Sequence, residues 1–180
     1  WGFVAGFPIL QDKLFGFVSF GHIGYAGQQN YARDLFLASV LAAPWHDMND
    51  AVKRIKALEE FKTNPDCQRL VIAFKRVSNI LKGIDPSANG PDAALLVEPQ
   101  EKALFEASRA LAPKMKELRE KGDYKLAFET LASIKDIIDA FFDKVMVMSD
   151  DAKVRENRLA LLNSIRDLYF RIADLSRLMA

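Results

Sequence analysis

The spacing of apolar residues along the chain changes after about residue 30. From Tyr31 onward they recur every three or four positions, which is the period of a buried helix face, and no stretch alternates like a β-strand. The pattern therefore predicts an all-α helical bundle over residues 31–180. Residues 1–30 form a separate apolar segment, rich in glycine and phenylalanine, to which the pattern assigns no element.

Turn and capping residues divide the helical region. Asp47 or Asn49 caps the second helix, Pro44 ends the first, and Gly83 lies where glycine closes a helix. Residues 84–97 are rich in turn formers and are expected to be a loop. The apolar face of the second helix consists of Ala51, Val52, Ile55, Leu58 and Phe61. The predicted helices span residues 31–42, about 51–61, 67–82, 98–121, 124–138 with a continuation or bend into 140–148, and 152–178.

Residues 1–30 contain six of the nine glycines but none of the glycine patterns that cradle a phosphate. The segment also holds Phe3, Phe7, Phe15, Phe17 and Phe20. These rings either form an exposed contact patch or pack on the helices of the same domain, and the sequence leaves both interpretations open. The start resembles no signal peptide, and no stretch is expected to span a membrane. Because the first residue is Trp1, we expect a fragment or a processed product.

The helix over residues 67–82 has an apolar face and a basic face. At roughly 100° per residue, one stripe carries the expected core residues Leu70, Phe74, Val77 and Leu81. The opposite side carries cations and an amide but no acid: Arg69, Lys75, Arg76, Asn79 and Lys82. This side is either a surface that contacts phosphates or an ordinary solvated face.

The last predicted helix repeats this arrangement. Its apolar stripe comprises Val154, Leu161, Ile165, Leu168, Ile172, Leu175 and Met179. Arg155, Arg166 and Arg177 are spaced by eleven residues, almost three turns, so they are expected to line up on one edge. Asn163 and Phe170 lie beside that edge, and the other flank carries Glu156, Asp167 and Asp174. Phe170 can stack on an unpaired base or contact a neighbouring helix or subunit.

Composition narrows the possible chemistry. Half of the residues are apolar and 27% are charged, as in a globular domain, and 25 basic residues balance 24 acidic ones. A nucleic-acid surface therefore requires segregation of charge within the fold. The single cysteine, Cys67, excludes an internal disulfide framework and fits a reducing, cytoplasmic compartment. Together with His22 and His46 it leaves little material for a zinc site.

No catalytic residue and no metal site are expected. Cys67 has no histidine near it in the sequence, so a nucleophile with its base is not indicated. Asp136, Asp139 and Asp143 recur at i, i+3 and i+7, a spacing that can hold a cation. More often such a spacing belongs to a solvated acidic face.

Two long segments resemble a known family. The run FFDKVMVMSDD at 141–151, followed by VRENRLALL at 154–162, closely resembles the C-terminal end of bacterial glycyl-tRNA synthetase β subunits. Shorter pieces at 52–58, 74–82, 128–132, 166–168 and 172–176 agree with it. The resemblance covers roughly residues 31–180, and residues 1–30 fall outside it.

The resemblance implies an all-helical anticodon-binding domain of the DALR type, similar to that of arginyl-tRNA synthetase. In the glycyl family two α and two β subunits form an α2β2 heterotetramer. The α subunit holds the aminoacylation site, and the β subunit binds tRNA(Gly). The resemblance thus implies one part of an ATP-dependent ligase, without the catalytic site and without a cofactor bound to this chain.

Two hypotheses follow for the function. In the first, the chain is a tRNA-binding module whose basic residues hold phosphates while an amide and an aromatic ring read unstacked anticodon bases. In the second, it is a helical protein-interaction module that docks on a partner subunit and binds no nucleic acid. The salt dependence of binding distinguishes the two hypotheses, because a complex held by phosphate contacts weakens steeply as the salt concentration rises. The candidate tRNA-binding residues are Lys75, Arg76, Asn79, Lys82, Arg155, Arg158, Arg166 and Phe170.

Overall fold

Helices make up all the regular structure in the part of the chain that the computed structural model describes, which is residues 27–44, 47–84 and 90–179. No strand occurs in these ranges, so the all-α prediction is confirmed. Most of the glycine- and phenylalanine-rich segment and both histidines lie outside the described residues. The elements are α1 (Gly27–Ala42), α2 (Met48–Phe61), α3 (Asp66–Leu81), the 3₁₀ helix η1 (Ala93–Leu95), α4 (Pro99–Lys121), α5 (Tyr124–Ala132), α6 (Lys135–Lys144), α7 (Ala152–Phe170) and the 3₁₀ helix η2 (Leu175–Met179).

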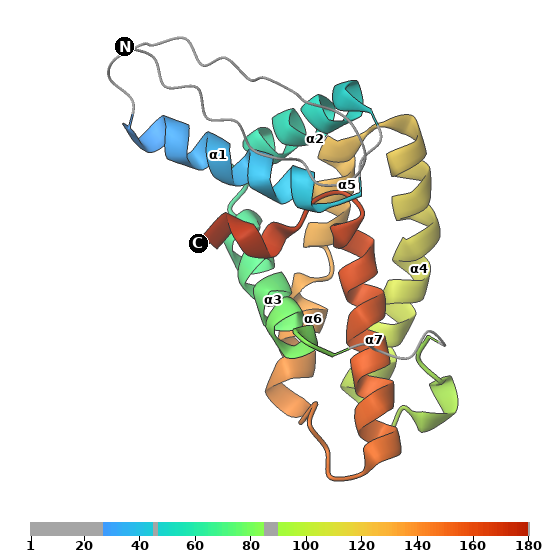
Figure 1. Cartoon of the computed structure of the whole chain (residues 1–180). Helices are drawn as coiled ribbons and strands as arrows, with labels where there is room; N and C mark the ends of the chain where they lie inside the picture. The colour runs from blue at the N-terminus through green and yellow to red at the C-terminus, as the bar shows by residue number, and fades with distance from the viewer. Residues whose placement is uncertain (1–26, 45–46, 85–89, 180) are drawn as a thin grey trace.

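The helices form an elongated bundle (Figure 1). Along its length α4 packs on α6 and α7, while α3 packs on α6 and α7 from the other side. At the upper end α1 crosses the bundle and contacts both α2 and η2, so the first and last described elements lie side by side. The two ends of the described chain are therefore held together by direct packing.

Capping residues act where the sequence predicts them. The Asp47 side chain accepts the Asn49 N–H at 2.9 Å, which satisfies one of the free donors at the start of α2. Glu98 and Glu101 form a capping box at the start of α4. Gly83 and Gly122 follow α3 and α4 with φ values of 75° and 70°, a left-handed conformation that glycine adopts without a side-chain clash.

The predicted helix over residues 124–138, with its continuation toward 148, is wrong in its length. α5 ends at Ala132, and α6 begins at Lys135 after a short break. At the break, Ser133 Oγ donates to the Thr130 carbonyl at 2.7 Å, a local bond that competes with helix continuation. α6 then ends at Lys144, so the apolar run up to Met148 is extended or turned rather than helical.

The predicted last helix also ends early. α7 stops at Phe170, and the chain turns into η2. Arg54 Nη1 of α2 donates to the carbonyls of Arg171 at 3.2 Å and Ile172 at 3.4 Å, which occupies acceptors at the end of the helix. Arg177 therefore does not continue the line of arginines along α7, and that part of the prediction is wrong.

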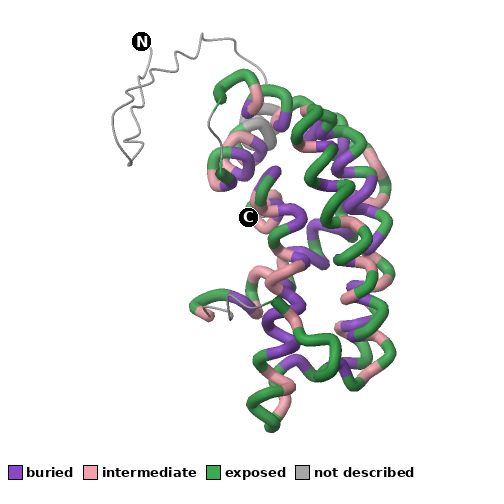
Figure 2. The backbone as a smooth tube through the Cα atoms, turned by 90° about the vertical axis from the view of Figure 1, so that its right-hand side faces the viewer, coloured by how far each residue is buried: buried purple, intermediate pink, exposed green. Residues whose placement is uncertain are grey.

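The core follows most of the predicted stripes, although Ile55 and Val154 are only half-buried. Figure 2 shows buried backbone along the inward sides of the helices. The ring of Phe74 stacks on Tyr169 with centroids 4.0 Å apart, which joins the core faces of α3 and α7. The α3 stripe of Leu70, Phe74, Val77 and Leu81 is fully buried as expected. On α2, however, Val52 is 42% exposed, whereas Arg54 is buried.

The predicted loop over residues 84–97 contains a short element. η1 forms within it, capped by the Asp92 side chain, which accepts the Ala94 N–H at 2.9 Å. Asn157 of α7 holds this segment through two bonds: its Oδ1 accepts the Asp92 N–H at 2.7 Å, and its Nδ2 donates to the Asp92 carbonyl at 3.0 Å. A buried side-chain amide thus substitutes for secondary structure in ordering the loop.

Candidate nucleic-acid interface

Four of the eight candidate residues meet in one cleft between α3 and α7. Asn79 and Lys82 reach it from the end of α3, and Arg166 and Phe170 reach it from the end of α7. Residues of η2 close the remaining side, and the cleft encloses about 630 Å³. We refer to this site as the α3–α7 cleft. Helical periodicity within each helix predicts the four residues, but only the packing of the two helices brings them together.

Tyr169 fixes the two walls of the α3–α7 cleft relative to each other. Its hydroxyl forms a 2.8 Å hydrogen bond with Ser78, the residue before Asn79, while Phe170 follows it directly on α7. Burial raises the pKa of Tyr169 to about 12, so the hydroxyl is neutral and keeps this bond at ordinary pH. The polar side chains of the cleft therefore project from a rigid, packed base.

The cations of the α3–α7 cleft differ in whether an acid neutralises them. Within the described residues, Lys82 and Arg166 form no ion pair. Arg177 does, because its Nε lies 3.1 Å from Asp174 Oδ2. Asp174 also accepts the Ser176 hydroxyl at 2.6 Å, so the carboxylate that lines the cleft is already engaged. Lys82 and Arg166 are consequently available to an external anion.

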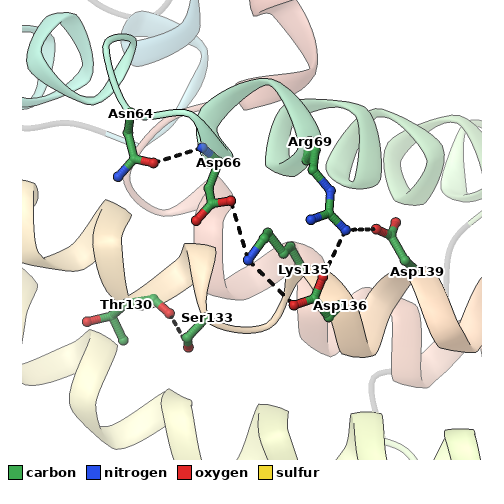
Figure 3. Close-up of polar contacts among 8 residues, drawn as sticks. All are labelled: Asn64, Asp66, Arg69, Thr130, Ser133, Lys135, Asp136 and Asp139. Atoms are coloured by element: carbon green, nitrogen blue, oxygen red, sulfur yellow. Dashed lines mark hydrogen bonds and ion pairs between the residues drawn. The ribbon is translucent and has the colours of Figure 1, made fainter.

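The basic side of α3 is not free of acid as predicted, because α6 supplies carboxylates to it. Arg69 Nη2 lies 2.8 Å from Asp136 and 3.2 Å from Asp139 (Figure 3). The hydrogen bond from Arg69 holds the pKa of Asp136 below its usual range. Two of the three acidic residues predicted as a solvated face or cation site thus act as counter-charges to α3. In the described part of the chain no cluster of metal-ligating side chains occurs.

Lys75 and Arg76 lie away from the centre of the α3–α7 cleft. The exposed Arg76 guanidinium stands 4.3 Å from the centroid of the Phe142 ring of α6, a cation–π arrangement. Lys75 is half-buried and lies one helical turn before Asn79. Lys75 is therefore not among the residues that line the cleft, and Arg76 packs against α6.

Arg155 and Arg158 hold the opposite end of α7. Arg155 Nη1 donates to the Ser149 carbonyl at 2.7 Å. Arg158 is buried, pairs through Nε with Glu101 of α4, and donates through Nη1 to the Met146 carbonyl at 2.8 Å. Both guanidinium groups fasten the loop between α6 and α7. The Arg158 side chain is enclosed by the fold and does not belong to an RNA-facing surface.

Cys67 is buried in the fold. Burial raises the pKa of its thiol, which disfavours the thiolate form that a nucleophilic cysteine requires. In the described part of the chain, no helix is both long enough and apolar enough to cross a bilayer.

Comparison with known proteins places this geometry in a family. The model of the DALR anticodon binding domain matches residues 70–171, from the first turns of α3 to the end of α7. The chain belongs to the DALR anticodon binding domain family. The matched range contains Asn79, Lys82, Arg166 and Phe170, so the α3 and α7 walls of the cleft lie within it, while the η2 residues that close the cleft lie beyond it.

Several similar proteins bear one name. The chain is 43% identical over 150 residues to the glycine–tRNA ligase beta subunit of Acidobacterium capsulatum, covering 79% of the chain and 21% of that protein. It is 40% identical over 151 residues to the same subunit of Neisseria meningitidis serogroup C, covering 84% of the chain and 22% of that protein. For Marinobacter nauticus the identity is 42% over 153 residues, with the same coverage of 84% and 22%. The chain thus spans about a fifth of the length of the curated relatives it matches.

Proposed function

We propose that this chain is the tRNA-binding module of a glycyl-tRNA synthetase β subunit. Its membership of the DALR family and its likeness to glycine–tRNA ligase beta subunits support the assignment. The observation that carries it is the α3–α7 cleft, where two unpaired cations, an amide and an aromatic ring converge from two helices.

Each residue of the α3–α7 cleft suits one part of a single-stranded RNA loop. Lys82 and Arg166 hold backbone phosphates, which give affinity but carry no base information. The Asn79 amide donates and accepts, so it pairs with the edge of an unstacked base. Phe170 offers a ring face for stacking, which every base can use. Lys75, Arg76 and Arg155 then contribute at most peripheral phosphate contacts.

In the complete enzyme, this module contributes recognition rather than chemistry. We expect the β subunit to present tRNA(Gly) to an α subunit, which catalyses ATP-dependent glycylation within an α2β2 assembly in the cytoplasm. The chain itself is expected to bind neither ATP nor a metal ion. Pyrophosphate exchange with glycine and ATP should therefore stay at the level of a control without protein.

Binding of a tRNA(Gly) transcript across a range of salt concentrations tests the proposal. We expect affinity to fall steeply with salt, with a slope of about 0.7 to 0.9 for each phosphate contacted. Nuclease footprinting of the same complex should show protection of the anticodon loop. Lys82→Ala should weaken binding. Lys102→Ala serves as the matched control and should not, because Lys102 is an exposed lysine of α4 outside the cleft.

Two results would contradict the proposal. One is the absence of binding at low salt by a chain that is folded. The other is binding that salt does not weaken and that leaves the anticodon loop unprotected. Either result would favour the alternative function, a helical module that docks on a partner subunit.

A further inference from the structure

Phe170 also borders a second depression, distinct from the α3–α7 cleft. This depression encloses about 600 Å³ and is lined from several elements. Arg54 comes from α2, Arg119 from the last turn of α4, and Arg171 from the end of α7. We call these three residues the arginine cluster. They are separated by more than fifty residues of sequence, so no local pattern in the chain indicates that they meet.

Arg54 is the structural member of the arginine cluster. Its Nη2 lies 2.6 Å from Asp50, and its guanidinium stands 5.2 Å from the centroid of the Tyr124 ring. Its Nη1 donates to the Arg171 carbonyl at 3.2 Å, which holds the backbone that carries the Arg171 side chain. Arg54 Nε remains buried with no hydrogen-bond partner in the structure. Arg54 therefore positions the cluster and leaves one buried donor beside it.

Arg119 and Arg171 have no such partners. Within the described residues, neither guanidinium forms a hydrogen bond or an ion pair. Arg119 is half-buried, and its pKa is lowered, first by burial and then by the positive charges of Arg171 and Arg54. Like charges held together in this way gain free energy when an anion binds between them.

The acids of this depression do not neutralise Arg119 or Arg171. Asp50 already pairs with Arg54 and accepts the Tyr124 hydroxyl. Glu120 lies 3.9 Å from Lys116, and Asp167 forms no ion pair in the described part of the chain. No carboxylate oxygen approaches within 4.0 Å of the Arg119 or Arg171 guanidinium among these residues. Asp167 is thus a fixed negative charge that opposes anion binding at this site.

We propose that Arg119 and Arg171 form a second phosphate-binding site, which takes a phosphodiester of the same RNA strand that occupies the α3–α7 cleft. The proposal rests on the proposed function, because the ligand is RNA. Phe170 lines both depressions. A base stacked on its ring directs the phosphate on one side toward Lys82 and Arg166, and the phosphate on the other side toward Arg119 and Arg171. Guanidinium groups suit this role because they donate in a planar fork to phosphate oxygens.

Substitutions in the 180-residue chain test this site with a tRNA(Gly) transcript as the probe. Arg119→Gln and Arg171→Gln should each weaken binding about tenfold at low salt, as expected for loss of a charged hydrogen bond. Each should also reduce the salt slope by about 0.7 to 0.9. Arg109→Gln is the matched control, because Arg109 is an exposed arginine of the same helix α4 and lines neither depression.

Two additional variants keep the test independent of folding. Asp167→Asn removes the opposing charge and should strengthen tRNA binding by roughly two- to fivefold at low salt, since surface charges interact modestly. Arg119→Lys keeps the charge but loses the fork, so it should fall between the wild-type chain and Arg119→Gln. Thermal unfolding monitors the fold, and Arg119→Gln should leave Tm nearly unchanged, because Arg119 forms no hydrogen bond or ion pair among the described residues.

The outcomes separate this inference from the proposed function. If Lys82→Ala weakens binding while Arg119→Gln, Arg171→Gln and Asp167→Asn all match Arg109→Gln, the second phosphate site is refuted and the α3–α7 cleft stands. If the folded wild-type chain binds no tRNA at low salt, the proposed function and this site are both refuted.

Discussion

The two ends of α7 use arginine in opposite ways. At its N-terminal end, Arg158 is buried, pairs with Glu101 and ties the Met146 backbone to the bundle. At its C-terminal end, Arg166 lies eight residues further along, half-exposed and without an ion pair among the described residues. The comparison shows that Arg158 is enclosed where a neighbouring helix supplies a carboxylate, whereas Arg166, which no carboxylate pairs with among the described residues, stays available to a ligand.

Breaking the buried pair should have the largest effect. Arg158→Ala leaves the Glu101 carboxylate, which is fully buried, without its counter-charge. We expect a loss of about 3–5 kcal/mol in the free energy of unfolding, measured by urea denaturation. Arg166→Ala provides the comparison at the other end of the helix. Equal destabilisation by the two variants would contradict the distinction between them.

The Tyr169 hydroxyl should make stability depend on alkaline pH. Its pKa is raised to about 12 in the folded chain, so the unfolded chain loses this proton first as pH rises from about 10. The stabilising contribution is thus complete below about pH 10 and is lost between pH 10 and 12, by about 2–3 kcal/mol.

Tyr169→Phe isolates this effect. The variant lacks the titrating group, so its free energy of unfolding should fall less steeply than that of the wild-type chain over pH 10–12. Denaturant titrations at several pH values provide the measurement. Parallel curves for the two proteins would show that burial does not shift this hydroxyl.

Phe170 should contribute to the affinity for tRNA but not to the salt dependence of binding. Phe170→Ala should weaken tRNA binding by about 1–3 kcal/mol while leaving the salt slope nearly unchanged, because base stacking involves no counterion release. Binding titrations at two or more salt concentrations measure both quantities. If the substitution lowers stability and leaves tRNA binding intact, the ring acts only in packing.

The smallest effect on stability is expected for Arg166. Arg166→Ala should change the free energy of unfolding by less than about 0.5 kcal/mol, as is usual for residues without buried contacts. It should nevertheless reduce the salt slope of tRNA binding by about one, for any tRNA sequence. Lys153→Ala is the control on the same helix, since Lys153 is exposed at the other end of α7 and does not line the α3–α7 cleft.

The sequence predicts much of the fold because its signals are local. Capping residues act within one turn of the chain: Asp47 precedes α2, Glu98 precedes α4 and Gly83 follows α3. Together with helical periodicity they predict the starts of α3, α4 and α7, which the structure confirms. The early end of α7 has a distant cause, because the acceptor carbonyls at Arg171 and Ile172 meet Arg54. No pattern within the last helix reports a contact with α2.

The candidate site, too, could be predicted only where its signals lie within one helix. Periodicity places Asn79 and Lys82 on one side of α3, and Arg166 and Phe170 on one side of α7, without showing that the two sides meet. The roles of Arg158 and Arg69 could not be predicted, because their acids lie on α4 and α6. Arg119 was missed altogether, since its neighbours Arg54 and Arg171 are distant in sequence.

The contacts that α1 and α2 make with the C-terminal segment have a consequence for the order of folding. Asp174 N–H donates to the Ser39 carbonyl at 2.8 Å, and Arg54 reaches the Arg171 carbonyl across 117 residues of chain. During synthesis, α1 and α2 leave the ribosome long before these partners exist. We therefore expect the α3–α7 cleft and the arginine cluster to assemble in the closing steps of folding, after contacts between residues close in sequence have formed.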